Sequence, residues 1–534
     1  NEATHVLAPD QGNVLAEPLA IHLCQLVAML ALDPNWLAHG HLATIDVPFT
    51  LAALLSLAAG FRWLAEPRWQ RWALFALAFS AAALVGLLLA STLPLRTEFS
   101  WLLPDNQPSV RALHALTKRR PSTAVIEVGD TTVALGQIAR AHRDAPEIAR
   151  GLQVVAVTGS TGKTSTKDLI ASILEAHAPG EVLRTEGNLN NHFGVPLTLL
   201  RLRPGQRFAV VELGMSARGE IAYLTSLARP NVGVITNVGP AHLLQLGTVD
   251  NVAAAKGELF SGLSDGAAAV FLGSAEHERI KTQAISAGAV ARSGRLRAVT
   301  ALRDGETPNG QPPSVVYKLL SETEEGLEME LRCLSPVSGN LGAPVVGRVP
   351  LLGVHHADNA ALAAAAALAL DVPPTVIAQG LGRVAPGKHR GQLLQVAGRR
   401  ILDDCYNANP DSTVAAMRTL AALRGSGRAI AVLGDMLELG LDEEALHAGV
   451  GEAAARCGIS LLVTIGPRAA HSARSAAAKG VATIVAGSAE EAAAAVVKNS
   501  ARGDFILIKG SRGMALEHVL DHLRVKLEGA ASPS

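Results

Sequence analysis

One stretch of the chain, residues 154–165 with the sequence VVAVTGSTGKTS, constrains the fold more than any other. Its four leading apolar residues predict a buried parallel strand, and the apolar residues Leu169, Ile170 and Leu174 predict a helix that follows the glycine turn. A glycine turn between a buried strand and a helix directs backbone N–H groups and the positive end of the helix dipole at an anion. The stretch therefore predicts a phosphate-binding loop in an α/β domain with a parallel sheet.

The residue types in the turn indicate which group does what. Gly159 and Gly162 let the backbone approach phosphate oxygens, Lys163 neutralises their charge, and the Thr164 hydroxyl suits Mg²⁺. The spacing is G-x-x-G-K-T, shorter than the general G-x-x-x-x-G-K-T motif. A turn that only joins strand to helix is the alternative, and the Lys and Thr after the second Gly disfavour it. The predicted nucleotide-binding residues of the loop are Gly159, Ser160, Thr161, Gly162, Lys163, Thr164 and Ser165.

Composition sets outer limits on the function. The 534 residues have room for three or four domains, and 49% hydrophobic residues are ample for sizeable cores. The 47 basic residues balance the 47 acidic residues, which argues against a basic nucleic-acid-binding surface. The 4 cysteines form no C-x-x-C pair, so we expect a reducing compartment and neither a disulfide framework nor a structural zinc site.

The first 120 residues predict one or more membrane segments. Residues 72–95 carry no charge over a length that, at ~1.5 Å per residue, exceeds the ~30 Å hydrocarbon core of a bilayer, so we expect a transmembrane helix there. The uncharged runs 18–32 and 47–61 are shorter and equally compatible with buried or interfacial helices. The sequence HGHLATIDVP at 39–48 is weakly similar to the membrane region of dolichyl-phosphate-mannose-type glycosyltransferases, and we assign no glycosyl transfer to it.

Two more predicted strands end in, or are closely followed by, a residue type that can bind a cation. Glu212 closes the apolar run that begins at Phe208, and His242 follows shortly after the apolar run 232–235. The carboxyl ends of parallel strands meet at the edge where α/β sheets bind ligands, so we expect Glu212 and His242 to share a cation site. For Glu212 alone, a solvated strand end is the alternative.

Three further stretches carry a family resemblance. The sequences GNLNNHFGVP at 187–196, YNANPDS at 406–412 and LGDMLELG at 433–440, together with the short loop, resemble the Mur ligase family over roughly residues 121–525. The resemblance implies an ATP- and Mg²⁺-dependent amide ligase of peptidoglycan precursor synthesis. It is strongest to the member that joins D-alanyl-D-alanine to a UDP-N-acetylmuramoyl-tripeptide through an acyl phosphate, and it implies a monomer without nucleic-acid partners.

The resemblance also implies roles for single residues. It places Lys163, Lys256, His242 and Arg390 in catalysis; Thr164, Glu212, His242 and a carbamylated Lys256 around magnesium; Asn359, Arg390 and Asp404 at the nucleotide; and Asn190, Asn191, Tyr406, Asn407, Asn409 and Ser412 at the substrates. Each has a structural alternative. Lys256 suits a solvated helix face, Arg390 a linker and Asp404 a strand-end turn, while Asn and Ser are ordinary turn and capping residues.

The predicted domain order is a membrane region (1–120), a remnant of the family's N-terminal domain (121–150), a central ATP-binding domain (151–388), a Rossmann-like C-terminal domain (389–528) and a disordered tail (529–534). The family's N-terminal domain binds the UDP-sugar, and its body is replaced here by the membrane region. A membrane-tethered or chimaeric nucleotide-binding protein without ligase activity is therefore the second hypothesis. ATP use places the part after residue 96 in the cytoplasm, tethered to the inner membrane if the helix 72–95 exists.

Overall fold

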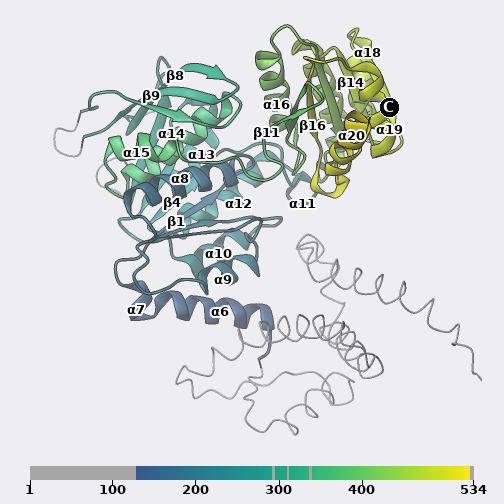
Figure 1. Ribbon diagram of the computed structural model, residues 1–534. Helices are drawn as coiled ribbons and strands as arrows, with labels where there is room; N and C mark the ends of the chain where they lie inside the picture. Colours follow the sequence, from purple (N-terminus) through teal and green to yellow (C-terminus); the bar gives the residue numbers. More distant parts are fainter. Residues whose placement is uncertain (1–127, 291–294, 309–311, 336–339, 530–534) are drawn as a thin grey trace, which may run out of the picture. The chain divides into compact units, whose positions relative to one another are not determined.

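The computed structural model describes residues 128–290, 295–308, 312–335 and 340–529 (Figure 1). The chain divides into two units at residues 138 and 139, inside the predicted remnant 121–150. The predicted membrane helix 72–95, the glycosyltransferase-like stretch 39–48 and the tail from 530 lie outside the described residues. Among the helices that are described, none is both long and apolar enough to span a bilayer.

The central lobe, residues 153–381, is built on a sheet with the strand order β10-β9-β8-β7-β5-β4-β1-β3-β2. Neighbours from β2 to β8 pair in parallel, whereas β8, β9 and β10 pair antiparallel at one edge. The strands are β1 (Gln153–Thr158), β2 (Val182–Arg184), β3 (Phe208–Glu212), β4 (Val232–Ile235), β5 (Ala268–Leu272), β7 (Leu296–Arg303), β8 (Val315–Thr323), β9 (Gly326–Cys333) and β10 (Val345–Val349); the short β6 (Ala289–Val290) pairs with β7.

Helices cover both faces of this sheet (Figure 1). On one face lie α8 (Lys163–His177), α14 (His355–Leu368) and α15 (Pro374–Leu381); on the other lie α9 (Gly194–Leu199), α10 (Glu220–Ala228), α12 (Val249–Ser261) and α13 (Glu278–Ser286). Because strand side chains alternate, Val155 and Val157 of β1 join the first core, and Val154 and Ala156 join the second. The predicted buried strand and the helix after the loop are both confirmed.

Three more of the described helices are α6 (Thr131–Asp144), α7 (Pro146–Ala149) and α11 (Leu243–Leu246).

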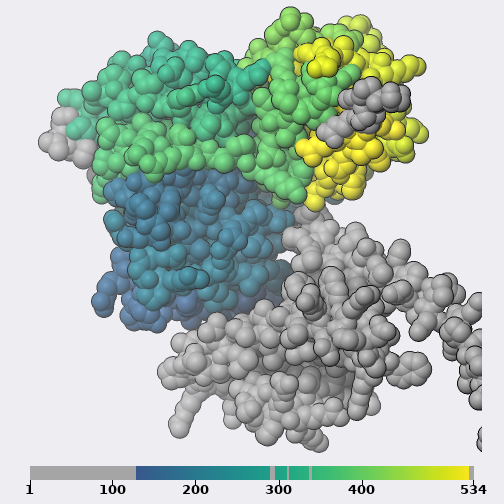
Figure 2. Space-filling model, in the orientation of Figure 1, coloured from purple at the N-terminus to yellow at the C-terminus, as the bar shows by residue number. Residues whose placement is uncertain are grey.

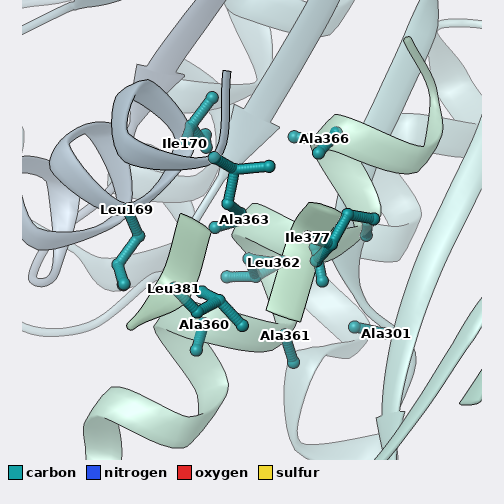
Figure 3. Close-up of a cluster of buried hydrophobic side chains, with 14 of the residues drawn as sticks. Leu169, Ile170, Ala301, Ala360, Ala361, Leu362, Ala363, Ala366, Ile377 and Leu381 are labelled. Atoms are coloured by element: carbon teal, nitrogen blue, oxygen red, sulfur yellow. The ribbon is translucent and has the colours of Figure 1, made fainter. Parts of the chain in front are cut away.

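Small residues let the helices of the first face pack closely. The buried alanines of α14 are surrounded by leucine and isoleucine side chains of α8 and α15 (Figure 3). Gly380 of α15 lies so near α8 that an added Cβ would be 2.3 Å from the Cα of Ile173. A larger side chain at Gly380 would push α15 away from α8, the helix that begins at the predicted phosphate-binding loop. Side chains fill the spaces between the ribbons of this lobe (Figure 2).

The C-terminal lobe, residues 392–529, is a second α/β layer structure with the strand order β11-β12-β16-β13-β14-β15. Only β11 runs antiparallel to its neighbour among these described strands. Its elements are β11 (Gln392–Val396), β12 (Arg399–Asp403), α16 (Pro410–Leu423), β13 (Ala429–Gly434), α17 (Glu443–Arg456), β14 (Leu461–Ile465), α18 (Ala469–Ala478), β15 (Ala482–Ala486), α19 (Ala489–Asn499), β16 (Phe505–Lys509) and α20 (Glu517–Gly529).

The α/β class with mainly parallel sheets is confirmed in both lobes. Sequence patterning missed β11 and β15, because both lie at sheet edges and are only partly buried, which weakens their apolar pattern. The peripheral strands expected at 296–350 are β7 to β10, which extend the central sheet.

Candidate active site

The predicted phosphate-binding loop joins β1 to α8 in a conformation that only glycine permits at two positions. Gly159 has φ +154° and Gly162 has φ +77°. A Cβ at Gly159 would lie 1.8 Å from Thr236 Oγ1, and one at Gly162 would lie 2.5 Å from Asn359 Oδ1. The glycines are therefore required both for the turn and for the close approach of neighbouring side chains.

The segment after β4 holds the loop in place. The Asn237 side chain accepts a hydrogen bond from Thr161 N at 2.8 Å, and the Asn237 carbonyl accepts one from Ser160 N at 3.1 Å. The Ser160 hydroxyl donates to Gly239 O at 3.1 Å and accepts from Gly239 N at 3.0 Å. These bonds fix the loop before any ligand arrives, which lowers the cost of ordering it on binding.

Two lysines meet at one backbone oxygen of this loop. Lys163 Nζ donates to Gly159 O at 2.8 Å, and Lys256 Nζ, from α12, donates to the same oxygen at 2.9 Å. Lys256 is 1% exposed, so it is not the solvated helix lysine of the alternative hypothesis. Burial, reinforced by the charge of Lys163, holds the pKa of Lys256 well below its usual range. Burial likewise lowers the pKa of Lys163, although Glu212 opposes this shift.

A buried carboxylate lies beside the lysines. Glu212, at the end of β3, is 2% exposed. Its Oε2 accepts from Thr164 Oγ1 at 2.8 Å and its Oε1 accepts from Asn190 Nδ2 at 2.8 Å. Since both donors are neutral, they orient the carboxylate without cancelling its charge, and a carboxylate with a threonine hydroxyl is a donor set that suits Mg²⁺.

His242 is held by the C-terminal lobe. Its Nδ1 lies 2.7 Å from Glu438 Oε2, and the backbone oxygen of Glu438 accepts from Leu244 N at 3.3 Å. Both His242 (φ +55°) and Glu438 (φ +65°) adopt the left-handed conformation. A carboxylate on Nδ1 leaves Nε2 as the ring nitrogen available to a metal, an arrangement common among metal-binding histidines.

The predicted nucleotide contacts of the C-terminal lobe also have defined partners. The Arg390 guanidinium stacks 3.8 Å above the Tyr406 ring centre, and its charge contributes to the low pKa of Lys163. Asp404 accepts a hydrogen bond from the buried Lys509 Nζ at 2.6 Å. In the central lobe, the Asn359 side chain accepts from Thr166 Oγ1 at 3.3 Å, beside the phosphate-binding loop.

Several predicted substrate residues have structural partners. Asn191 Oδ1 accepts from the N–H groups of Phe193 and Gly194 at the start of α9. Asn409 and Ser412 form a reciprocal capping box at the start of α16. These bonds account for the residue types, and the substrate roles stay predictions.

Two more predicted substrate residues lie in the loop after β12. The Asn407 side chain accepts from Ala408 N at 2.9 Å, and the Tyr406 ring faces the Arg390 guanidinium. The Asn190 amide donates to Glu212 Oε1. The substrate roles of Asn190, Tyr406 and Asn407 stay predictions.

Sequence reasoning missed three residues of the site: Asn237, Glu438 and Lys509. Asn237 and Lys509 each lie at or just beyond the carboxyl end of a parallel strand, β4 and β16, so the rule that selected Glu212 would have found them. Glu438 lies in the stretch 433–440, which resembles the family. Its role depends on a contact with His242, which is 196 residues away in the chain.

Comparisons with known proteins match both lobes to named domains. Residues 157–367 match the Mur ligase middle domain, and residues 389–512 match the Mur ligase glutamate ligase domain. The chain is 35% identical over 403 residues to the UDP-N-acetylmuramoyl-tripeptide–D-alanyl-D-alanine ligase of Bacillus subtilis, covering 75% of this chain and 81% of that protein. The corresponding Escherichia coli ligase is 35% identical over 404 residues, with 81% of its length covered.

Solved structures show the same relationship. A crystal structure of MurF from Acinetobacter baumannii is 30% identical, with a TM-score of 0.64 over 75% of this chain and 82% of that chain. MurF from Thermotoga maritima in complex with ADP, at 24% identity and a TM-score of 0.63, shares the fold. With the family models matching in both lobes and relatives above 30% identity covered over most of their length, the chain belongs to the Mur ligase family.

Proposed function

We propose that the chain is the ATP-dependent ligase that joins D-alanyl-D-alanine to a UDP-N-acetylmuramoyl-tripeptide. The observation that carries the proposal is the convergence of Lys163 and Lys256 on Gly159 O beside the buried Glu212 and Thr164. Cationic, hydroxyl and carboxylate groups in this arrangement suit a nucleotide with its magnesium ion. The named relatives supply the identity of the two substrates.

The reaction needs transfer of the γ-phosphoryl group of ATP to the acceptor carboxylate, giving an acyl phosphate and ADP. The amine of D-alanyl-D-alanine then attacks the acyl carbon, an amide bond forms, and inorganic phosphate leaves as the amine proton passes to solvent. A bound Mg²⁺, held by Thr164, Glu212 and His242, would screen the charges of phosphate and carboxylate from each other. Lys163 places its own positive charge at the loop where phosphate charge develops.

Lys256 fits the proposed carbamate. Its amine is buried and burial lowers its pKa, which favours the uncharged form that can add CO₂. The addition converts an uncharged amine to an anion and releases one proton. Two protonated amines at one acceptor would repel each other, whereas an anionic Lys256 would attract the positive charge of Lys163.

The C-terminal lobe completes the site in this proposal. Arg390 and Asp404 contact the nucleotide, and Glu438 orients His242. Because His242 and Glu438 belong to different lobes, a complete cation site would form only when the lobes are together, which excludes water from the reacting groups. We further propose that the ligase lobes act in the cytoplasm, where ATP is available, and as a monomer.

Release of inorganic phosphate tests the proposal. We expect release when ATP, UDP-N-acetylmuramoyl-tripeptide and D-alanyl-D-alanine are all present, and background release when either of the last two is omitted. Lys318→Ala, at an exposed position of β8, is a control that should retain full activity, whereas Lys163→Ala should not. Phosphate release that is independent of D-alanyl-D-alanine would identify a nucleotide hydrolase and overturn the assignment.

A further inference from the structure

A cluster of three side chains of different chemistry lies at the carboxyl end of β12 in the C-terminal lobe. They are His389, Asp403 at the end of β12 and Cys405, and their ligand atoms lie within 4.8 Å of one another. His389 Nδ1 is 2.7 Å from Asp403 Oδ2, and Cys405 Sγ donates to Asp403 Oδ1 at 3.0 Å. Imidazole, carboxylate and thiol are the three protein groups that bind zinc.

A fourth titratable side chain lies within electrostatic reach of the cluster. Glu517, at the start of α20, interacts electrostatically with both His389 and Cys405. Its Oε1 is paired with Arg512 at 2.6 Å, but its Oε2 is buried and accepts no hydrogen bond from the described residues. A buried carboxylate oxygen without a donor is costly unless something else satisfies it.

The cluster is mostly buried, and only two of its side chains are partly exposed. Asp403 is 1% exposed and Cys405 is fully buried, whereas the side chains of His389 and Glu517 are 18% and 21% exposed. In the proposal that follows, a cation would enter past the partly exposed side chains of His389 and Glu517. The reaction scheme of the ligase uses none of these four side chains.

We propose that His389, Asp403, Cys405 and Glu517 bind a thiophilic divalent cation of the Zn²⁺ type. On binding, the Cys405 S–H bond breaks, sulfur keeps the electron pair and bonds to the metal, and one proton passes to solvent. The His389 proton moves from Nδ1 to Nε2 through solvent, so that the Nδ1 lone pair faces the metal. The ligand atoms of His389, Asp403 and Cys405 lie within 4.8 Å of one another, so one ion could contact all three after small adjustments, and Glu517 would supply the fourth ligand of a four-coordinate ion.

The position of this cluster gives binding a consequence, which rests on the proposed function. His389 precedes Arg390, and Cys405 lies between Asp404 and Tyr406. A metal would tie together the two segments that carry the proposed nucleotide contacts of the C-terminal lobe. Binding itself does not depend on the ligase assignment.

Cobalt is a suitable probe, because a Co²⁺–thiolate bond gives a charge-transfer absorption band. The full chain, freed of metal by chelator, is titrated with Co²⁺ and then with Zn²⁺ in the absence of nucleotide. We expect one Co²⁺ per chain, a thiolate band, displacement by Zn²⁺ and a higher thermal unfolding midpoint with Zn²⁺. Cys405→Ser should abolish the band and weaken Zn²⁺ binding by about tenfold or more. Glu517→Gln should weaken binding while keeping the band.

Cys457→Ser is the matched control, because Cys457 is a free, partly exposed cysteine of the same lobe. It should behave as the wild type does. Absence of a thiolate band in the wild type, or a band that persists in Cys405→Ser and disappears in Cys457→Ser, would overturn the proposal. If Cys405→Ser proves unfolded by circular dichroism, His389→Ala provides the same test, and unchanged Co²⁺ affinity in that folded variant would refute the site.

Discussion

Replacing Lys256 by arginine tests the chemistry of the buried lysine pair. One amine lies 2.8 Å and the other 2.9 Å from Gly159 O, so the two nitrogens are at most 5.7 Å apart. Two unit charges at that separation repel by about 3 kcal/mol at an effective dielectric constant of about 20. Wild-type Lys256 can avoid this repulsion by losing its proton or, as proposed, by becoming a carbamate, whereas arginine stays charged and cannot form the same carbamate.

We therefore expect Lys256→Arg to lose both stability and activity. The free energy of unfolding should fall by about 3 kcal/mol, measured by urea denaturation, and turnover should fall by about 10²-fold, measured as phosphate release. Lys256→Met is the matched control, since it fills a similar volume without charge. It should lose activity to the same degree but retain more stability. Adding a short-chain carboxylic acid to Lys256→Ala should restore part of the rate by supplying the missing anion.

Activity of Lys256→Arg within a few-fold of wild type would refute the carbamate. The side chain would then serve only to bond Gly159 O, which a guanidinium can also do. Equal stability of the arginine and methionine variants would show instead that the repulsion between the two positions is smaller than calculated.

Five other variants test separate residues, four of them in the site. Lys163→Ala should reduce turnover by about 10²-fold at saturating ATP, and wild-type turnover would reject the phosphate-binding loop. Glu212→Ala and His242→Ala should each raise the Mg²⁺ concentration needed for half-maximal rate; unchanged midpoints in both would argue against a metal there. Glu438→Gln should raise the same midpoint by about tenfold through the loss of a charge-assisted hydrogen bond, and an effect on stability alone would make Glu438 merely structural. His447, a buried residue of α17, lies outside the site. Burial lowers its pKa, so its stabilising contribution is present above about pH 6.5 and is lost as pH falls toward the lower folded-state pKa. The free energy of unfolding, measured by urea denaturation at about pH 8 and about pH 5.5, should therefore fall more at the lower pH in wild type than in His447→Gln, and equal losses would contradict this.

Local patterns predicted most of the fold because each needs only neighbouring residues. The run of apolar residues before Gly159 predicted β1, and the rule that ligand groups follow the carboxyl ends of parallel strands located Glu212. Residue type alone did not separate two roles for Asn409: it was predicted to contact substrate, asparagine also caps helices, and the structure shows it as the cap of α16.

Contacts between distant segments lay beyond the reach of sequence patterns. The bond from His242 to Glu438 joins two lobes, and the shared acceptor of Lys163 and Lys256 joins α8 and α12 across a loop. The cluster of His389 and Cys405 is another example, since cysteine spacing argued against a metal site. Spacing rules identify only ligands that are close in the chain, whereas here the fold brings them together.

The fate of an oxygen atom tests the ligase assignment most directly. If the acceptor carboxylate is phosphorylated, one of its oxygens becomes the bridging oxygen of the acyl phosphate and leaves with phosphate. With UDP-N-acetylmuramoyl-tripeptide labelled with ¹⁸O in that carboxylate, we expect the released phosphate to carry ¹⁸O in step with amide formation, measured by mass spectrometry. Amide product accompanied by unlabelled phosphate, or labelled acceptor recovered unchanged while ATP is consumed, would contradict ligation through an acyl phosphate at this site.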